Sequence, residues 1–265
     1  AEHFFAIPAS AGISPEQCHF RKQRTTPVSV VSQVLARGTL LDGFVSRLDH
    51  ELDLPTVSFP DIPVASAAEI EAAADHAREH WRLGTGPISS MMRVVENAGA
   101  VVSFFSGVSE RVDALSIDCV RPMIIRSEAK PAACRLRFDL AHEAGHLIMH
   151  RGIQTGDKVT EDQANRFASA FLLPRSSFIH EFPRSRLLDW SAIFSLKLRW
   201  KVSAAAILRR AYDLRMISPD QYRTGYIHLS KTGQRRAERF DDQIPTEMPE
   251  LLPKALQALE AAFPG

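Results

Sequence analysis

The 265-residue sequence has little of several features that mark specialised classes of protein. Its three cysteines, Cys18, Cys119 and Cys134, lie far apart and form no CxxC pair, which disfavours a disulfide scaffold or zinc knuckle and predicts reduced, mostly buried thiols. No apolar run is long enough to cross a bilayer, and residues 1–8 lack the pattern of a secretory signal. A formal net charge of +1 gives no overall field that would attract nucleic acid or anionic lipid.

The composition that is present, 45% hydrophobic and 24% charged residues, is typical of a soluble globular chain with one sizeable core or two modest ones. Residues 1–65 are rich in proline and are expected to form an arm or connector, followed by an α+β fold with a small sheet and a mostly helical C-terminal part. We expect Ser66 to cap one helix and residues 160–163 to open another as a capping box. Helices are predicted at residues 28–52, 66–81, 88–97, 136–150, 160–173, 187–198 and 203–214, and strands at residues 100–105, 113–117 and 120–126.

The segment HEAGH at residues 142–146 matches the HExxH metal-binding motif and lies on a stretch with helical spacing. Residues four apart share one face of a helix, so the imidazoles of His142 and His146 can reach one metal ion. Glu143 stands beside them and can take a proton from the attacking water. Gly145 costs about 1 kcal/mol relative to alanine in mid-helix, which favours a close approach to the helix at this point. The alternative is a surface helix with two solvated histidines.

A catalytic zinc needs a third protein ligand, for which the sequence offers three candidates. His150 continues the spacing of four, but it lies about 12 Å along the helix axis from His142 and is better interpreted as a partly buried residue at the helix end. Glu161 and Asp162 both open the next helix. Glu161 shares its stripe with small and apolar residues at i+3, i+7 and i+11, whereas Asp162 shares its stripe with polar residues. Glu161 is therefore the predicted third ligand.

Two longer motifs carry a resemblance to a known family. Residues 137–150, RFDLAHEAGHLIMH, and residues 161–174, EDQANRFASAFLLP, resemble the ImmA/IrrE metallopeptidases, whose pattern is close to RFTLAHExGHxxxH followed by ExxANxFAxxLLMP. The likeness covers most of residues 15–240 and departs from the pattern at Asp139 and at Arg175. It implies a zincin-like metallopeptidase domain at residues 66–180, between the N-terminal arm at 1–65 and a helical C-terminal region at 181–265.

The resemblance also implies a function. It predicts a cytoplasmic, gluzincin-like endopeptidase in which zinc or manganese is held by His142, His146 and Glu161, with Glu143 as the catalytic base. The implied substrate is a Xre-type helix-turn-helix repressor, cleaved in a stress or DNA-damage response. The alternative is a transcriptional regulator whose peptidase-like domain senses a small ligand with little or no proteolysis.

The longer branch of this family carries a helix-turn-helix domain at its N-terminus. Residues 18–21 and the helix after them resemble the connector that follows such a domain, and the chain begins at Ala1 rather than Met. Contact with DNA is therefore expected only through a domain missing from this chain or through a partner, and no membrane contact is expected. A protein that naturally lacks the DNA-binding part is the other possibility.

Two expectations concern the substrate. The strand at residues 120–126 contains Pro122, which cannot donate to a ladder, so we expect an edge strand that either receives an extended peptide or is merely protected from aggregation. An open groove across the metal would favour a peptidase, and an enclosed pocket would favour a sensor. The group that stabilises the oxyanion cannot be chosen from the sequence among His180, Tyr212, Tyr222, Tyr226 and His228.

Overall fold

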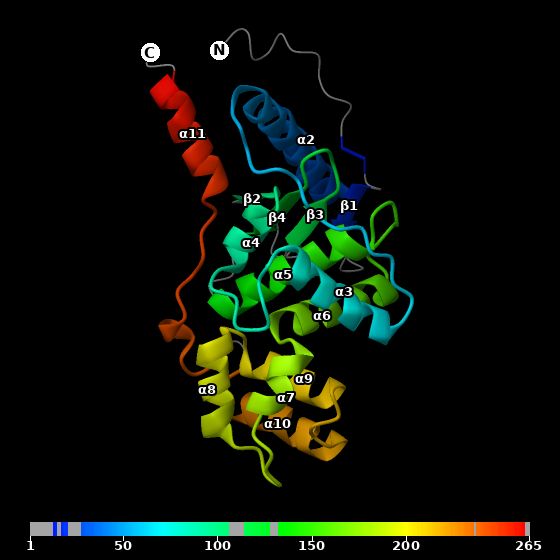
Figure 1. Cartoon of the computed structure of the whole chain (residues 1–265), viewed down its shortest axis with the longest axis vertical. Coiled ribbons are helices and arrows are strands. Elements are labelled where there is room, and N and C mark those ends of the chain that lie inside the picture. Colours follow the sequence, from blue (N-terminus) through cyan, green and yellow to red (C-terminus); the bar gives the residue numbers. More distant parts are fainter. Residues whose placement is uncertain are drawn as a thin grey trace.

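The computed structural model describes residues 13–14, 17–20, 28–105, 114–127, 132–235 and 237–262 (Figure 1). The described part is α+β, as predicted: it is mostly helical and has one four-stranded sheet. Arg21 of the predicted connector lies outside the described residues. The strands are β1 (Cys18–Phe20), β2 (Val101–Phe105), β3 (Ala114–Ile117) and β4 (Met123–Ser127). The helices are α2 (Val28–Glu51), α3 (Ala67–His80), α4 (Met91–Asn97), α5 (Ala133–Met149), α6 (Lys158–Leu172), α7 (Arg175–Glu181), α8 (Trp190–Trp200), α9 (Ala204–Asp213), α10 (Pro219–Lys231) and α11 (Leu251–Ala262), with a 3-10 turn, η2 (Asp241–Gln243).

The sheet has the strand order β1-β3-β4-β2. β3 pairs antiparallel with both β1 and β4, whereas β2 pairs parallel with β4. β4 is therefore an interior strand, and the expectation that residues 120–126 form an edge strand is wrong. The ladder starts only at Met123, and Pro122 lies just before it, where its carbonyl oxygen accepts a hydrogen bond from the N–H of Val101 at 2.8 Å. Because Pro122 takes part in the sheet only through its carbonyl oxygen, its lack of an N–H group costs no hydrogen bond of the ladder.

The side chains of the sheet alternate between two helical layers, as the pleat of a strand requires. Met123 and Ile125 of β4 belong to a core cluster that includes Val34 and Val45 of α2. Ile124, between them in sequence, belongs to the larger cluster that contains α4, α5 and α6. The sheet is thus covered by α2 on one face and by α4 and α5 on the other, which places α5 directly against β3.

The starts of α3 and α6 are set by local side-chain hydrogen bonds. Ser66 caps α3 and forms a capping box with Glu69, as predicted for Ser66. The predicted capping box at residues 160–163 is wrong, because α6 starts one turn earlier: the carboxylate of Asp157 accepts hydrogen bonds from the N–H groups of Val159 and Thr160. The predicted helix at 28–52 corresponds to α2, and the one at 136–150 corresponds to α5.

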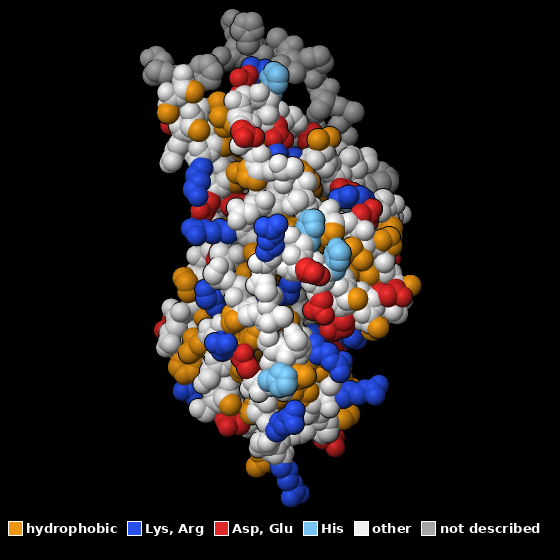
Figure 2. All heavy atoms as spheres, viewed as in Figure 1, with side chains coloured by type: hydrophobic (Ala, Val, Ile, Leu, Met, Phe, Trp, Pro, Cys, Tyr) orange, Lys and Arg blue, Asp and Glu red, His pale blue; other side chains and the backbone are white. Residues whose placement is uncertain are grey.

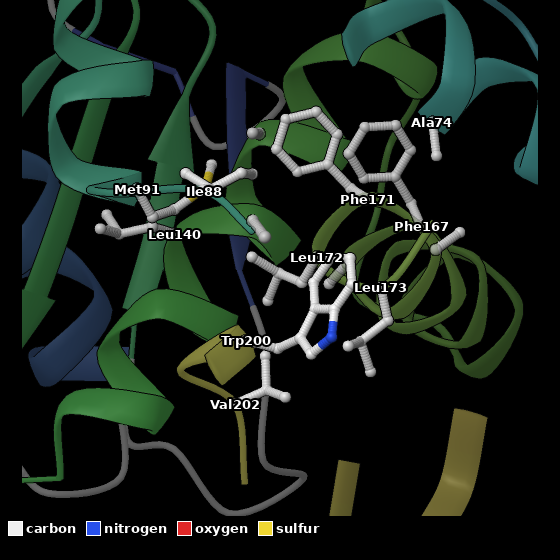
Figure 3. Close-up of a cluster of buried hydrophobic side chains, with 14 of the residues drawn as sticks. Ala74, Ile88, Met91, Leu140, Phe167, Phe171, Leu172, Leu173, Trp200 and Val202 are labelled. Carbon is white, nitrogen blue, oxygen red and sulfur yellow. The ribbon is translucent and has the colours of Figure 1, made fainter. Parts of the chain in front are cut away.

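The larger core runs along α5 and α6 and extends from Phe59 to Leu229. Figure 3 shows part of it, with Trp200 of α8 set beside Leu172 and Leu173 at the end of α6. This one cluster contains residues from all three of the predicted parts, 1–65, 66–180 and 181–265. The division into those parts remains a prediction.

Two buried arginines join segments that are distant in sequence. Arg137 of α5 has a fully buried side chain that donates to Glu247, in the segment after α10, and to the carbonyl oxygen of Ile88 at 2.7 Å. Arg210 of α9 is 1% exposed and donates to both carboxylate oxygens of Glu71 in α3, at 2.5 and 2.8 Å. Bidentate and charge-assisted bonds of this kind compensate the cost of burying a guanidinium group.

On the face shown in Figure 2, basic and acidic side chains are interspersed rather than gathered by sign. Among the described residues, no helix combines the length and the apolar character needed to span a membrane. Cys18 and Cys134 are buried and Cys119 is half-buried, in agreement with the mostly buried cysteines that the composition predicted.

Candidate metal centre

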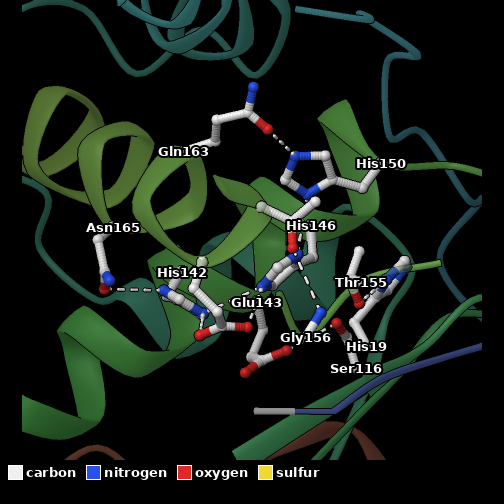
Figure 4. Close-up of polar contacts among 12 residues, drawn as sticks. His19, Ser116, His142, Glu143, His146, His150, Thr155, Gly156, Gln163 and Asn165 are labelled. Atoms are coloured by element: carbon white, nitrogen blue, oxygen red, sulfur yellow. Dashed lines mark hydrogen bonds and ion pairs between the residues drawn. The ribbon is translucent and has the colours of Figure 1, made fainter. Parts of the chain in front are cut away.

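Three ligand-type side chains meet where α5 packs against α6. His142 and His146 lie one turn apart on α5, and Glu161 comes from the first turn of α6. The two imidazole Nε2 atoms are 3.1 Å apart, and the Glu161 carboxylate turns one oxygen to each of them, at 3.6 Å from His142 and 3.5 Å from His146. The structure therefore brings together the three predicted ligands (Figure 4). Asp162 is exposed and lies outside this group.

The spacing of these three side chains fits a metal ion. Ligand atoms at the usual 2.0–2.1 Å from zinc in tetrahedral geometry are about 3.3 Å from one another. The two Nε2 atoms are 3.1 Å apart, and each lies 3.5 or 3.6 Å from the Glu161 oxygen nearest to it, Oε1 for His146 and Oε2 for His142, so these distances lie close to that value. Two imidazole nitrogens and one carboxylate are also a donor set found in catalytic zinc sites.

The close packing of the two helices depends on Gly145. A Cβ atom at this position would lie 2.8 Å from Cδ1 of Phe167, whose side chain is fully buried. Real Cβ atoms do not approach other atoms so closely, so only glycine allows α6 to lie this near α5. The expected close approach at Gly145 is confirmed, and the approaching group is the Phe167 ring.

Asn165 fixes the tautomer of His142. The Oδ1 atom of Asn165 lies 3.1 Å from Nδ1 of His142. An amide oxygen can only accept, so Nδ1 of the neutral ring carries the proton and Nε2 keeps its lone pair. That lone pair belongs to the atom that faces His146 and Glu161.

A chain of two hydrogen bonds fixes the tautomer of His146 in the same way. Oε1 of Gln163 lies 2.9 Å from Nε2 of His150, which must therefore be the protonated nitrogen of that ring. Burial lowers the pKa of His150, so the ring is neutral and its Nδ1 is an acceptor. Nδ1 of His146, 2.9 Å away, then donates, and its Nε2 is left with a lone pair. His150 is thus a buried helix-end residue that orients a ligand of the centre, a role the sequence did not reveal.

Glu143 lies beside the three ligands and is held from the sheet. Its side chain is 2% exposed, and the hydroxyl group of Ser116 in β3 donates to its Oε2 at 2.7 Å. A carboxylate oriented by one hydrogen bond and placed next to a metal site is positioned to accept a proton. The role of Ser116 was not predicted, because it depends on the strand that packs against α5.

His19 of β1 also reaches the centre and was not predicted. Its ring stacks on that of His146, with centroids 5.2 Å apart and planes inclined by 7°. Nδ1 lies 3.0 Å from the hydroxyl of Thr155. Burial, and to a lesser extent the nearby His146 and His150, lower the pKa of His19 to about 3, so the ring is neutral. The signal in the sequence was the segment at residues 18–21, interpreted only as a connector.

None of the candidates named from the sequence for the oxyanion is among the three ligands, but two of them line a neighbouring cavity. His228 stacks on Trp190 at 4.1 Å, and Tyr212 stacks on Tyr222 at 4.5 Å. Tyr222 and Tyr226 line a cavity of about 460 Å3 next to the centre, bounded by α5, α6, α9 and α10. Asn165 lines the same cavity, so the cavity adjoins His142.

Two histidines four residues apart, a glutamate from the next helix and a second glutamate beside the first histidine define a gluzincin-like metallopeptidase. The comparison with protein families agrees: residues 95–212 match the peptidase M78 model, described as the IrrE N-terminal-like domain. This part of the chain is therefore an IrrE N-terminal-like domain of the ImmA/IrrE metallopeptidase family. No curated protein matches the chain.

Proposed function

We propose that this chain is a zinc-dependent endopeptidase that cleaves a Xre-type helix-turn-helix repressor in a cytoplasmic response to stress or DNA damage. The observation that carries the proposal is the meeting of His142, His146 and Glu161 within 4.8 Å of one another, next to Glu143, in an IrrE N-terminal-like domain. The repressor as substrate is supported by the resemblance to the ImmA/IrrE family. Zinc suits the two imidazoles and one carboxylate, although manganese can be held by the same residues.

Different residues of the chain would have different roles in hydrolysis. A divalent metal bound here would supply Lewis-acid polarisation of the scissile carbonyl and acidify the attacking water. Glu143, oriented by Ser116, accepts the proton of that water and returns it to the leaving amine. Asn165 and the His150–Gln163 pair keep the two imidazoles in the tautomer in which Nδ1 carries the proton and Nε2 carries the lone pair that would bind a metal.

The substrate cannot add to β4, because that strand is hydrogen-bonded on both sides. The cavity beside His142 offers another place for part of the peptide. Its wall includes Phe138 and Asp139, one turn before His142, and Arg166, one turn after Asp162. We propose that a substrate side chain next to the scissile bond enters this cavity.

The test combines metal analysis with cleavage. The purified chain, loaded with Zn2+, is incubated with a candidate Xre-type repressor, and the fragments are identified by mass spectrometry. One metal per chain and one dominant cut, abolished by a chelator, are expected. Glu143→Gln is the matched control: it should bind metal as the parent does and fail to cut, since an amide cannot accept the proton. An uncut repressor in the presence of fully metal-loaded parent would contradict the proposed substrate.

A second function is favoured by the same cavity. A volume of about 460 Å3, lined by polar groups that include Arg166 and the buried Ser169, is in the range of small-molecule sites. We therefore retain the alternative of a regulator whose peptidase-like domain senses a small ligand. It would be supported if metabolites raised the melting temperature by mass action while the metal-loaded chain left the repressor intact. An inducer that binds while cutting continues would instead indicate an allosteric peptidase.

A further inference from the structure

We propose that His19 is a positioning residue of the metal centre, supplied by the N-terminal arm to a site whose other members lie within residues 116–165. This inference rests on the proposed function, because it assigns to His19 the task of holding His146 in the orientation that binds metal. It also extends the catalytic unit beyond residues 95–212, the span of the IrrE N-terminal-like domain.

The three-residue strand β1 places His19 with a defined register. In the antiparallel ladder His19 stands opposite Ser116, and the N–H of Asp118 donates to the carbonyl oxygen of Gln17 at 2.8 Å. Directly opposed residues of an antiparallel pair project on the same face of the sheet, here the face covered by α5. The Ser116 side chain contacts the catalytic base, and the His19 side chain contacts a metal ligand. Cys18, next to His19, projects to the other face, into the cluster beneath α2.

The contact with His146 is made by the flat face of the ring. The two rings are nearly parallel, and His19 is only 2% exposed, so it has little room to move aside. In Figure 4 His146 lies between His142 and His19, so His19 supports the ring from the side away from the other histidine ligand. His19 is not within the group of three ligands, and its action on a metal would pass through His146.

Two restraints therefore act on the His146 imidazole. The Nδ1–H group is held by His150 at 2.9 Å, which fixes one edge of the ring, and His19 covers one of its faces. Rotation of the His146 ring about its Cβ–Cγ bond would move Nε2 away from His142 and Glu161 and would have to displace His19. Removing a group that orients a metal ligand typically lowers metal affinity by 10–100-fold.

The experiment measures metal binding by the full chain. Zn2+ affinity is determined by competition with a chelator, and the visible absorption of the Co2+-loaded chain reports the coordination geometry. His19→Ala is expected to weaken Zn2+ binding about tenfold and to alter the Co2+ spectrum. His19→Phe, which keeps a flat ring but neither nitrogen, is expected to bind close to the parent. His19→Asn, which keeps a group able to bond Thr155 but no ring, should resemble His19→Ala.

Cys18→Ala is the matched control, because it also removes a buried side chain from β1 but on the opposite face of the sheet. It should leave affinity and spectrum unchanged, with folding of every variant checked by thermal melting. Equal losses in Cys18→Ala and His19→Ala would overturn the proposal, and so would His19→Asn binding better than His19→Phe. If the parent chain binds no Zn2+, its affinity will equal that of His142→Ala. That result contradicts the proposed function itself, whereas a parent that binds Zn2+ and an unaffected His19→Ala variant contradict only the role of His19.

Discussion

Gly145→Ala tests whether the metal centre depends on the close packing of α5 and α6. The added Cβ would lie 2.8, 3.1 and 3.3 Å from three carbon atoms of Phe167, against a normal carbon–carbon contact of about 3.5–4.0 Å. The helices must therefore separate by several tenths of an ångström. Phe167 is fully buried and stacks on Phe171 at 5.5 Å, so its ring cannot simply turn away.

The two effects of this substitution on stability oppose each other. Overpacking costs about 1–3 kcal/mol, and replacing glycine by alanine in a helix returns about 1 kcal/mol. We expect a net loss of about 0–2 kcal/mol in the free energy of unfolding, measured by urea denaturation. The effect on metal binding should be larger, because Glu161 moves with α6 and ligand distances tolerate only about 0.2 Å. Zn2+ affinity, measured by chelator competition, should fall by tenfold or more.

Gly43→Ala provides the control. Gly43 lies within α2, and a Cβ there would meet no atom within 4 Å, so this variant should be up to about 1 kcal/mol more stable than the parent. Gly145→Ala combined with Phe167→Leu should recover part of the Zn2+ affinity, because the smaller side chain relieves the contact. The reasoning is refuted if Gly145→Ala gains stability as Gly43→Ala does and binds Zn2+ like the parent.

Three further predictions can be tested on the same protein. Glu161→Ala should lose Zn2+ affinity while Asp162→Ala keeps it, measured by chelator competition; the reverse order would mean that the wrong carboxylate was assigned. Gln163→Leu removes the acceptor that sets the His150–His146 tautomers and should weaken Zn2+ binding about tenfold without loss of the fold, a prediction contradicted by unchanged affinity. Burial raises the pKa of Cys119 to about 12 and of Cys134 to about 11, so both thiols should be alkylated slowly below pH 9 in the folded chain and rapidly once the chain is unfolded. The free energy of unfolding should also fall as the pH rises above 9, because there the thiols ionise readily only in the unfolded chain.

The part of the site that lies on helices could be predicted from the sequence. His142 and His146 follow from helical spacing, and Glu161 follows from the apolar stripe that packs on α5, where residues 164 and 168 are fully buried. These are periodic signals that extend over many residues. The order of the strands could not be predicted in this way, because nothing in a short apolar run specifies which neighbours it pairs with. Pro122 suggested an edge strand, yet it precedes the ladder and contributes only its carbonyl group.

His19 and Ser116 could not be found from the sequence for a related reason. β1 has three residues and β3 has four, too few for any alternation to be recognised, and their pairing joins parts of the chain about a hundred residues apart. The effect of His150 on the tautomer of His146 could not be predicted, because it depends on the hydrogen bond between His150 and Gln163, a residue of another helix. Groups that act through tertiary contacts are visible only once the elements have been placed.

The buried arginines set a lower limit on the fragment that can be produced as a working unit. A fragment cut to residues 95–212 would retain Arg137 and Arg210 but lose Glu247 and Glu71, the carboxylates that neutralise them. Breaking a buried ion pair by removing one partner typically costs about 3–5 kcal/mol, comparable to the whole stability of many domains. Arg137 stands on the same helix as His142, so the damage would be felt at the metal ligands. Biochemical work on the peptidase should therefore start from a chain that includes α3 and the segment up to Glu247.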